Sequence, residues 1–230
     1  MKIIWLGHGS FRFEIAGKVL LLDPWLTGNP MLDADQHAAA TQGATHILLT
    51  HGHFDHVADV LDLARKHGVP VVGQYDLMSH WAEHEKIETV GFNKGGTVDL
   101  DGIKVTMVNA LHSSTFASPD GPRIAGTECG FIIEAEGHSI YVSGDTDVMS
   151  DMKIFHDLHK PDIGILSAGG HFTMDMRRAA YAAKTFFDFK TVIPCHYRTF
   201  PLLEQSAQVL IDALPDVDVI EPQVMQAIEI

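Results

Sequence analysis

Four side chains that could bind a metal ion lie within six residues of this chain: His51, His53, Asp55 and His56. His51 and His53 are two residues apart, so in an extended segment both imidazoles point to the same face. Asp55 and His56 are adjacent and must diverge, which suits two metal ions close together better than one. A histidine buried for structural reasons usually stands alone. We therefore interpret this segment, rather than a histidine-rich surface turn, as a metal site.

The residues around this segment predict that it is a loop between a strand and a helix. The apolar run 46–49 is typical of a buried strand. Apolar residues then recur at helical spacing, at Val57, Val60, Leu61 and Ala64, until Gly68 and Pro70 end the helix. Loops that follow a strand are where α/β proteins usually place their chemistry.

Three more candidate ligands follow predicted strands: His112 after 103–110, Asp145 after 139–143 and His196 after 191–193. Each stands just past a strand end, from which several chain segments can converge on one cleft. Taken singly, each has an ordinary structural explanation, since lone histidines are often structural and Asp145 could form a turn after Gly144. Their order behind the first four ligands favours a shared metal site.

The HxHxDH segment and the ligands that follow it resemble the metallo-β-lactamase superfamily. Segments 7–11, 169–175 and 193–201 look like those of compact bacterial and archaeal metal-dependent hydrolases related to the ascorbate-6-phosphate lactonase branch. The resemblance implies one ion held by His51, His53 and His112, a second held by Asp55, His56 and His196, and Asp145 bridging the two. Zinc is the first candidate for both divalent ions, with manganese, iron and nickel as alternatives.

Hydrophobic periodicity predicts an α/β (α+β) fold in one domain spanning residues 1–230. Strands at 2–6, 11–15 and 19–23 form an antiparallel meander, and an irregular stretch runs to residue 42. Later strands fall at 69–73, 97–100, 103–110, 129–135, 139–143, 163–166 and 191–193, and helices at 76–84, 149–159, 175–187 and 202–214. The two halves repeat one plan, which predicts a four-layer αββα sandwich of two mixed β-sheets.

The amino-acid composition of the chain limits the kinds of molecule that it is expected to bind. The chain has 16 Lys and Arg against 30 Asp and Glu, a formal net charge of −14, which argues against extended nucleic acid. No apolar run is long enough to span a membrane, and the first residues form a strand rather than a signal peptide. Only Cys129 and Cys195 are present, which fits a reducing compartment, so we expect a cytoplasmic protein. The sequence leaves open whether the chain forms a homo-oligomer.

These features predict a binuclear metal-dependent hydrolase that uses a metal-bridging hydroxide, with Asp55 orienting it and carrying a proton. The expected substrate is a small anionic ester, lactone or phosphodiester. Two alternatives stay open: a di-iron redox or oxygen-reacting protein, and a metal-binding regulatory protein without turnover. Cys195 precedes His196, but strand alternation would turn it away from the ligand.

Four further residues are candidates to assist at the site. His171 lies in a segment with two glycines before a helix start, and we predict a catalytic role for it in binding an oxyanion. His8 stands in the first turn and could support a ligand or face the substrate. Arg123 and Arg198 are the cations best placed in sequence to hold an anionic group, unless they are solvated surface residues.

Overall fold

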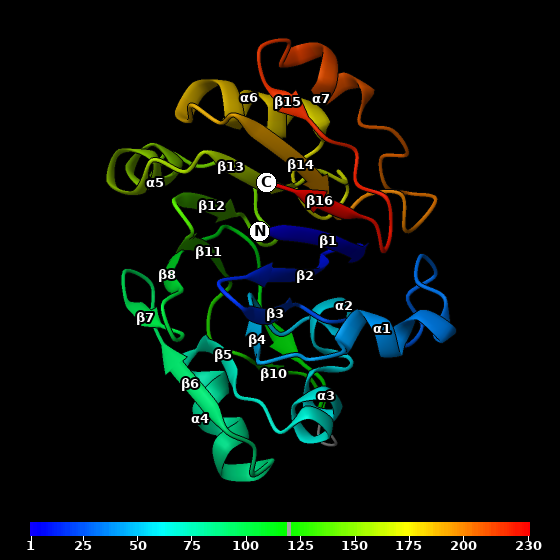
Figure 1. Ribbon diagram of the computed structural model, residues 1–230, viewed down its shortest axis with the longest axis vertical. Coiled ribbons are helices and arrows are strands. Elements are labelled where there is room, and N and C mark those ends of the chain that lie inside the picture. Colours follow the sequence, from blue (N-terminus) through cyan, green and yellow to red (C-terminus); the bar gives the residue numbers. More distant parts are fainter. Residues whose placement is uncertain (119–120) are drawn as a thin grey trace.

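Two seven-stranded β-sheets pack face to face in the computed structural model, which describes residues 1–118 and 121–230 (Figure 1). The strand order is β16-β1-β2-β3-β4-β5-β6 in the first sheet and β15-β14-β13-β12-β11-β8-β7 in the second. Helices cover the outer face of each sheet. The four-layer αββα sandwich expected from the sequence is therefore confirmed.

The first sheet combines an antiparallel meander with parallel strands. Its antiparallel strands are β16 (Ala227–Glu229), β1 (Lys2–Gly7), β2 (Ser10–Ile15) and β3 (Lys18–Leu22). Its parallel strands, beginning beside β3, are β4 (His46–Leu49), β5 (Val71–Gln74) and β6 (Thr89–Phe92). The edge strand β16 comes from the far end of the chain and lies beside β1 (Figure 1).

The second sheet repeats this plan. Its antiparallel strands are β7 (Thr97–Asp99), β8 (Lys104–Asn109), β11 (Cys129–Ala135) and β12 (His138–Val142). Its parallel strands are β13 (Ile163–Ser167), β14 (Thr191–Cys195) and β15 (Asp218–Val219). Two short strands, β9 (Thr115–Phe116) and β10 (Arg123–Ile124), form a separate hairpin.

The helices divide between the two halves of the chain. Those of the first half are a 3₁₀ turn (Ala34–Gln36), α1 (His37–Thr41), α2 (Phe54–Val57), α3 (Val60–His67) and α4 (Tyr75–His84). Those of the second half are α5 (Asp151–His159), α6 (Met176–Phe186) and α7 (Gln208–Ala213). Within the described ranges, none of these helices combines the length and apolar character needed to cross a bilayer.

Side-chain alternation along the strands builds two hydrophobic cores. Leu22 and Leu48 belong to the core between the sheets, whereas Leu21 and Leu49 belong to a second core against the outer helices. Successive strand residues point to opposite faces, so a strand that is apolar throughout must be covered on both sides. This double burial fixes the register of β3 and β4, and with it the position of the loops that follow them.

The helix predicted after the metal-binding segment is divided into α2 and α3. Asp59, just before α3, accepts hydrogen bonds from the backbone amides of Leu26 and Thr27 at 2.7 and 2.9 Å. The break at residues 58–59 thus ties the helix pair to the loop after β3. Gly68 ends α3 in the left-handed conformation, as its sequence position predicts.

Some elements differ from the sequence-based expectation. The stretch to residue 42 is not irregular throughout, because it contains α1. The last helix begins at Gln208 rather than at residue 202, because residues 201–206 form a loop in which the amide of Glu204 donates to the carbonyl of Gly169 at 2.9 Å. Strands β6, β15 and β16 and the β9–β10 hairpin were not expected.

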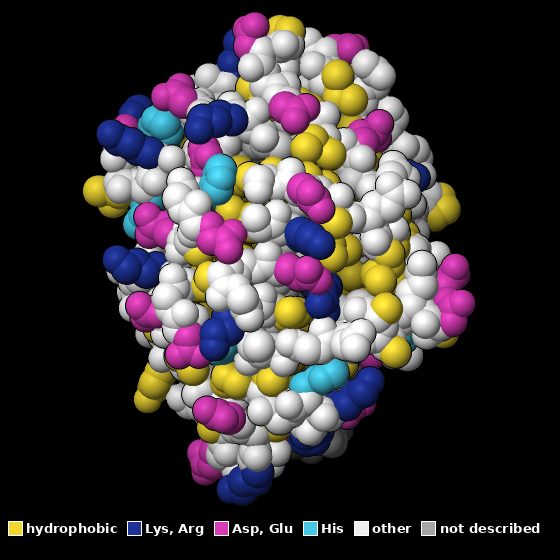
Figure 2. Space-filling model, in the orientation of Figure 1, with side chains coloured by type: hydrophobic (Ala, Val, Ile, Leu, Met, Phe, Trp, Pro, Cys, Tyr) yellow, Lys and Arg dark blue, Asp and Glu magenta, His cyan; other side chains and the backbone are white. Residues whose placement is uncertain are grey.

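Charged side chains of both signs are interspersed on the face shown in Figure 2. Lys and Arg side chains lie among Asp and Glu side chains there rather than in one basic patch. The expectation that the protein binds no extended nucleic acid stays a prediction from its net charge.

Candidate metal centre

The structure brings all seven predicted ligands together at the carboxyl ends of the strands. Four follow β4, and one each follows β8, β12 and β14. The Oδ2 atom of Asp145 lies at their centre. Its distances to imidazole Nε2 atoms are 3.1, 3.4, 3.7 and 3.9 Å, to His196, His56, His112 and His51.

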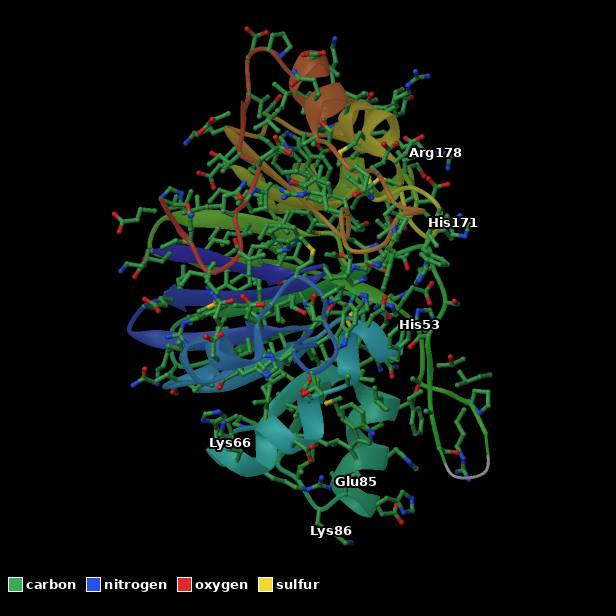
Figure 3. The ribbon with its side chains drawn as sticks, turned by 90° about the vertical axis from the view of Figure 1, so that its right-hand side faces the viewer. His53, Lys66, Glu85, Lys86, His171 and Arg178 are labelled. Carbon is green, nitrogen blue, oxygen red and sulfur yellow. The ribbon has the colours of Figure 1, made fainter. Side chains whose placement is uncertain are left out.

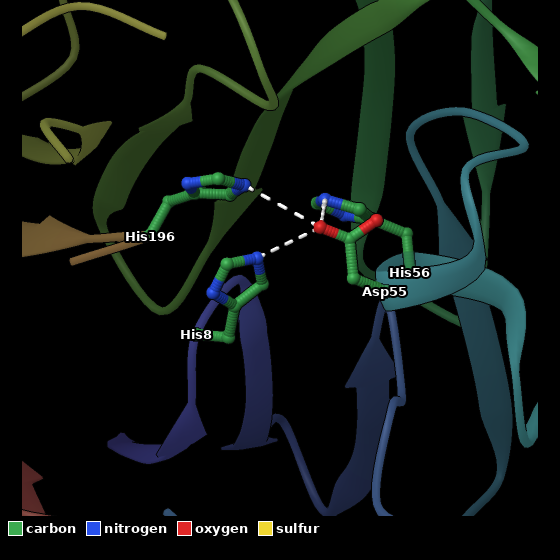
Figure 4. A group of neighbouring side chains, drawn as sticks. All are labelled: His8, Asp55, His56 and His196. Atoms are coloured by element: carbon green, nitrogen blue, oxygen red, sulfur yellow. Dashed lines mark hydrogen bonds and ion pairs between the residues drawn. The ribbon is translucent and has the colours of Figure 1, made fainter. Parts of the chain in front are cut away.

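The candidate ligand atoms form two groups, and a third group, made of Asp23, His51 and His56, connects them. His51, His53 and His112 form one, and the other consists of His8, Asp55, His56 and His196; within each, the ligand atoms lie within 4.8 Å of one another (Figure 4 shows the second). Apart from His8, this division matches the one that the family resemblance implies. Asp145 approaches members of both groups, as a bridging ligand would.

The residues present fit bound metal ions. Nε2 of His56 and Nε2 of His196 are buried, and their contacts with Asp145 lack the geometry of a hydrogen bond, so neither atom has a hydrogen-bond partner among the described residues. A buried polar atom without a partner is costly unless it has another function. A tetrahedral zinc ion with ligands at about 2.0 to 2.1 Å places those ligands roughly 3.3 Å apart. The separations around Asp145 are close to this value. The number and identity of the ions remain predictions.

Asp23 is a site residue that the sequence analysis missed. It follows β3 directly and is buried, and its Oδ2 lies 2.8 Å from Nδ1 of His56. The same carboxylate accepts hydrogen bonds from the amide and the hydroxyl of Thr50, at 2.8 and 2.6 Å. Asp23 could have been recognised in the sequence by its position at the end of a buried strand, because the predicted ligands occupy the same kind of position.

His8 supports Asp55. Its Nε2 lies 2.9 Å from Oδ2 of Asp55 (Figure 4). Its Nδ1 lies 2.8 Å from Oγ1 of Thr199. An ionised carboxylate only accepts hydrogen bonds, so Nε2 of His8 donates to Asp55. That proton prevents the same nitrogen from binding a metal ion. His8 therefore positions a candidate ligand, which corresponds to one of the two roles considered for it from the sequence.

The backbone around the site is strained. His8, Asp23 and His196 have positive φ angles of 54°, 44° and 57°, a conformation that costs free energy for residues other than glycine and is often found at functional sites. The amide of His196 donates to the carbonyl of His8 at 2.9 Å, which joins the two sheets at the site. A Cβ atom on Gly169 would lie 1.8 Å from the carbonyl oxygen of His196, so only glycine fits there.

Burial and neighbouring charges shift the pKa values at the site in opposite directions. Burial lowers the pKa of His51 well below its usual value, and it lowers that of His8 to about 4. Burial also opposes protonation of His196, but the interactions with the carboxylates of Asp145 and Asp55 together outweigh it and raise the pKa of His196 to about 9. Asp145 and Asp23 likewise raise the pKa of His56. Without metal, therefore, His56 and His196 hold protons that an ion must displace.

A cavity of about 770 Å³ opens above these residues. His53, Asp55, His112, Asp145 and His196 lie at its base, so both groups of ligands are accessible from it. Its walls are largely apolar and include Phe54, Phe116, Phe172, Phe200 and Leu202. In Figure 3, His53 lies on the side of the molecule where the hairpin of β9 and β10 extends away from the sheets.

The structure does not bring His171 into this cavity. His171 is exposed and lines a different depression with Asp175 and Glu204, while its neighbour Phe172 lines the cavity. The start of α6 is capped by the side chain of Asp175, which accepts from the amide of Arg178 at 2.8 Å. The predicted oxyanion-binding role of His171 therefore receives no support from its position.

The two candidate arginines also lie outside the residues that line the cavity. The guanidinium of Arg198 lies 5.8 Å from the ring centre of Tyr197. Arg123 lines a neighbouring depression beside α4. Cys195 is buried, and burial raises the pKa of its thiol well above the usual value, so it lacks the thiolate character of a nucleophile.

An αββα sandwich with a cluster of His and Asp ligands at the carboxyl ends of its strands defines a class of metal-dependent enzymes. The β-lactamase superfamily domain matches residues 18–197 of the chain. The chain is 72% identical over its full length to a UPF0173 metal-dependent hydrolase of Ruegeria pomeroyi, and 67% identical to one of Dinoroseobacter shibae, with complete coverage of both relatives.

The chain therefore belongs to the β-lactamase superfamily, within the UPF0173 metal-dependent hydrolases. A similar solved structure is Igni18, a metallo hydrolase of the archaeon Ignicoccus hospitalis, with a TM-score of 0.84 and 28% identity. The alignment covers 100% of this chain and 98% of Igni18. The family and the fold expected from the HxHxDH segment are thus confirmed.

Proposed function

We propose that the protein hydrolyses a small ester, lactone or phosphodiester with two bound divalent ions, zinc being the first candidate. The observation that carries this proposal is the convergence of four imidazole Nε2 atoms on one oxygen of Asp145, at 3.1 to 3.9 Å. Together with Asp145, these imidazoles come from four separate segments of the chain, and several of them lie at the base of a cavity. Because this cavity reaches the ligands directly, a substrate can approach them.

The side chains at the site would have two roles, binding the metal ions and positioning the water that attacks the substrate. His51, His53 and His112 would hold one ion, Asp55, His56 and His196 the other, and Asp145 both. When bound, such a pair of ions makes a water molecule more acidic and polarises an electrophilic oxygen. Asp55 also lines the cavity, so its carboxylate can orient the attacking water and hold a proton. His8 fixes that carboxylate through its hydrogen bond from Nε2.

The apolar walls support hydrolysis of a small molecule rather than a polymer. Ligand pockets of about 300 to 1,000 Å³ suit small molecules, and this cavity of about 770 Å³ lies in that range. The side chains of Asp145 and His196 at its base are buried. Charge interactions are stronger in such surroundings than in open water.

The test is elemental analysis of protein purified without chelators, followed by a hydrolysis assay with the same metal restored. The substrate panel contains 4-nitrophenyl esters, lactones, phosphodiesters and β-lactams. We expect two ions per chain and turnover in one of the first three classes. An absorption band of a reduced or oxidised iron centre without turnover would support a redox protein instead. Full metal loading with neither turnover nor redox activity would support a regulatory protein.

A further inference from the structure

The cavity above the metal centre has a polar base and apolar walls. Its base contains the ionisable side chains Asp55, Asp145, His53, His112 and His196. The walls above them carry four phenylalanines and a leucine: Phe54, Phe116, Phe172, Phe200 and Leu202. A bound molecule would therefore meet the ligands at one end and apolar groups at the other.

Several wall residues remain in contact with solvent although burial would stabilise them. Phe54, Phe172 and Leu202 are 63%, 51% and 54% exposed. They come from α2, from the loop after β13 and from the loop after β14, and they line the same cavity. Single exposed apolar residues are common, but a group that lines one concave surface is typical of a binding site.

The walls provide no cation for a charged substituent. Among the described residues that line the cavity, none is Lys or Arg. Residues 119 and 120, which lie outside the described ranges, are Pro and Asp in the sequence. Arg178, on α6, pairs with Asp147 at 2.7 Å rather than lining the cavity. The hydroxyls of Ser113, Thr115 and Ser118 also line the cavity but carry no charge. A second anionic group on the substrate would therefore be desolvated without a cationic partner.

Resting on the hydrolase function proposed above, we propose that the substrate carries its polar group only at the bond that is cleaved. The remainder is an uncharged aromatic or branched alkyl group, which packs between Phe54, Phe172 and Leu202. This narrows the expectation from the sequence, in which Arg123, Arg198 and His171 were candidates to hold an anionic group. Any negative charge on the substrate is confined to the reacting group, beside the ligands.

The test compares two substrates that differ by one distant charge. Within the class that is hydrolysed, one member has a phenyl group on the retained side, and its partner has a 4-sulfophenyl group. A sulfonate adds charge but binds metal ions weakly. This disfavours binding of the substrate in the reverse orientation, with the sulfonate at the metal ions. We expect kcat/KM to be about tenfold higher or more for the phenyl substrate. Burying a charge without a cationic partner costs enough free energy to lower affinity by about tenfold or more. Equal or higher kcat/KM for the sulfonated partner would overturn the proposal.

Variants of the wall make the test specific to this cavity. Phe172→Ala should raise KM for the phenyl substrate about tenfold, through loss of apolar contact, with kcat little changed. Leu202→Arg should shift the preference toward the sulfonated partner. Tyr181→Ala is the control, because Tyr181 is an exposed aromatic residue on α6 that does not line the cavity. Metal content and thermal unfolding are measured for each variant, so that loss of folding is separated from loss of contact.

Failure of the hydrolase proposal can be distinguished from failure of this one. If metal-loaded protein cleaves no member of the panel, the hydrolase proposal fails, and binding alone tests the cavity. Benzyl alcohol and 4-sulfobenzyl alcohol are then titrated by tryptophan fluorescence, since Trp25 packs against Phe54 and Phe200. Tighter binding of benzyl alcohol that weakens in Phe172→Ala supports the uncharged pocket. Equal binding of the two alcohols, or no effect of Phe172→Ala, overturns it.

Discussion

The buried carboxylate of Asp23 accepts a hydrogen bond from Nδ1 of His56 at 2.8 Å. It also accepts the hydroxyl hydrogen of Thr50, whose Oγ1 lies 3.0 Å from Nδ1 of His51. Because the hydroxyl hydrogen is committed to Asp23, Nδ1 of His51 must be the donor to Thr50. Both imidazoles thus carry a proton on Nδ1 when neutral, which leaves Nε2 free to bind a metal ion.

Replacing Asp23 should therefore weaken metal binding without removing a ligand. We expect Asp23→Asn to lower metal affinity by roughly 10-fold to 100-fold, the usual effect of losing a carboxylate that orients a histidine ligand. The measurement is competition with a chelator of known affinity. The protein should still fold, because the amide retains the size of the carboxylate.

Asp59→Asn is the matched control for this change. Asp59 accepts hydrogen bonds from the amide of Leu26 and the hydroxyl of Thr27, in the loop after β3, and not from a histidine ligand. This variant should loosen the loop after β3 but leave metal affinity close to that of wild type. If Asp23→Asn and Asp59→Asn had the same metal affinity, Asp23 would not be a positioning residue.

The convergence of the seven candidate ligands could be predicted from the sequence because each follows a strand that is apolar enough to recognise. Asp23 meets the same condition, but its role depends on the parallel pairing of β3 with β4, in which Leu22 lies opposite Leu48. That pairing places Asp23 beside Thr50, which is 27 residues away in the chain. No local pattern in the sequence encodes this neighbour.

The same reason explains which elements were missed. Strand β16 has only three residues and is held by pairing with β1, so its short sequence carries little signal.

His171 was expected at the site because two glycines precede it. The structure shows that Gly169 is needed for a different purpose, the close approach of the loop to His196. A glycine in the sequence indicates a close approach but does not identify what approaches.

Removal of one ligand from the first group should reduce the number of bound ions. We expect wild-type protein remetallated after purification to hold about two ions per chain, because seven ligands exceed the four of a tetrahedral site. His51→Ala and His53→Ala should each reduce this occupancy. Metal content is measured by elemental analysis after gel filtration, with His84→Ala, an exposed residue on α4, as the control. One ion in wild type, with unchanged occupancy in both variants, would refute the binuclear assignment.

Metal binding should release protons. Without metal, the pKa of His196 is raised from 6.5 to about 9, so the imidazole is protonated at neutral pH. This raised pKa stabilises the metal-free fold fully below pH 6.5, and the stabilisation is lost as the pH rises through about 9. An ion must displace the proton, so metal affinity should increase with pH until about 9.

Calorimetry can count the released protons. Zinc is titrated into metal-free protein at about pH 7.5 in two buffers with different ionisation enthalpies. The difference between the apparent binding enthalpies gives the number of protons, which we expect to be at least one per chain. Identical enthalpies in the two buffers would show that His196 and His56 are neutral before metal binds, contrary to the charge interactions described for the site.

Asp55 should matter more for turnover than for folding. Its carboxylate lies 3.7 Å from Nε2 of His196, receives a hydrogen bond from His8 at 2.9 Å and lines the cavity. Asp55→Asn retains the shape of the side chain but removes the charge and the capacity to take up a proton. We expect kcat to fall by about 10² to 10⁴, the usual range for loss of a general base. The thermal unfolding midpoint of the metal-loaded variant should stay within about 5 °C of wild type.

Two comparisons show whether this loss is chemical. Asp147→Asn removes a carboxylate that pairs with Arg178 and does not line the cavity, so its turnover should equal that of wild type. His8→Ala leaves the Asp55 carboxylate present but no longer fixed by the imidazole. Its kcat should therefore lie between those of wild type and Asp55→Asn at equal metal loading. Near wild-type turnover in fully loaded Asp55→Asn would remove this carboxylate from the mechanism, and the hydrogen bond from His8 would then have only a structural role.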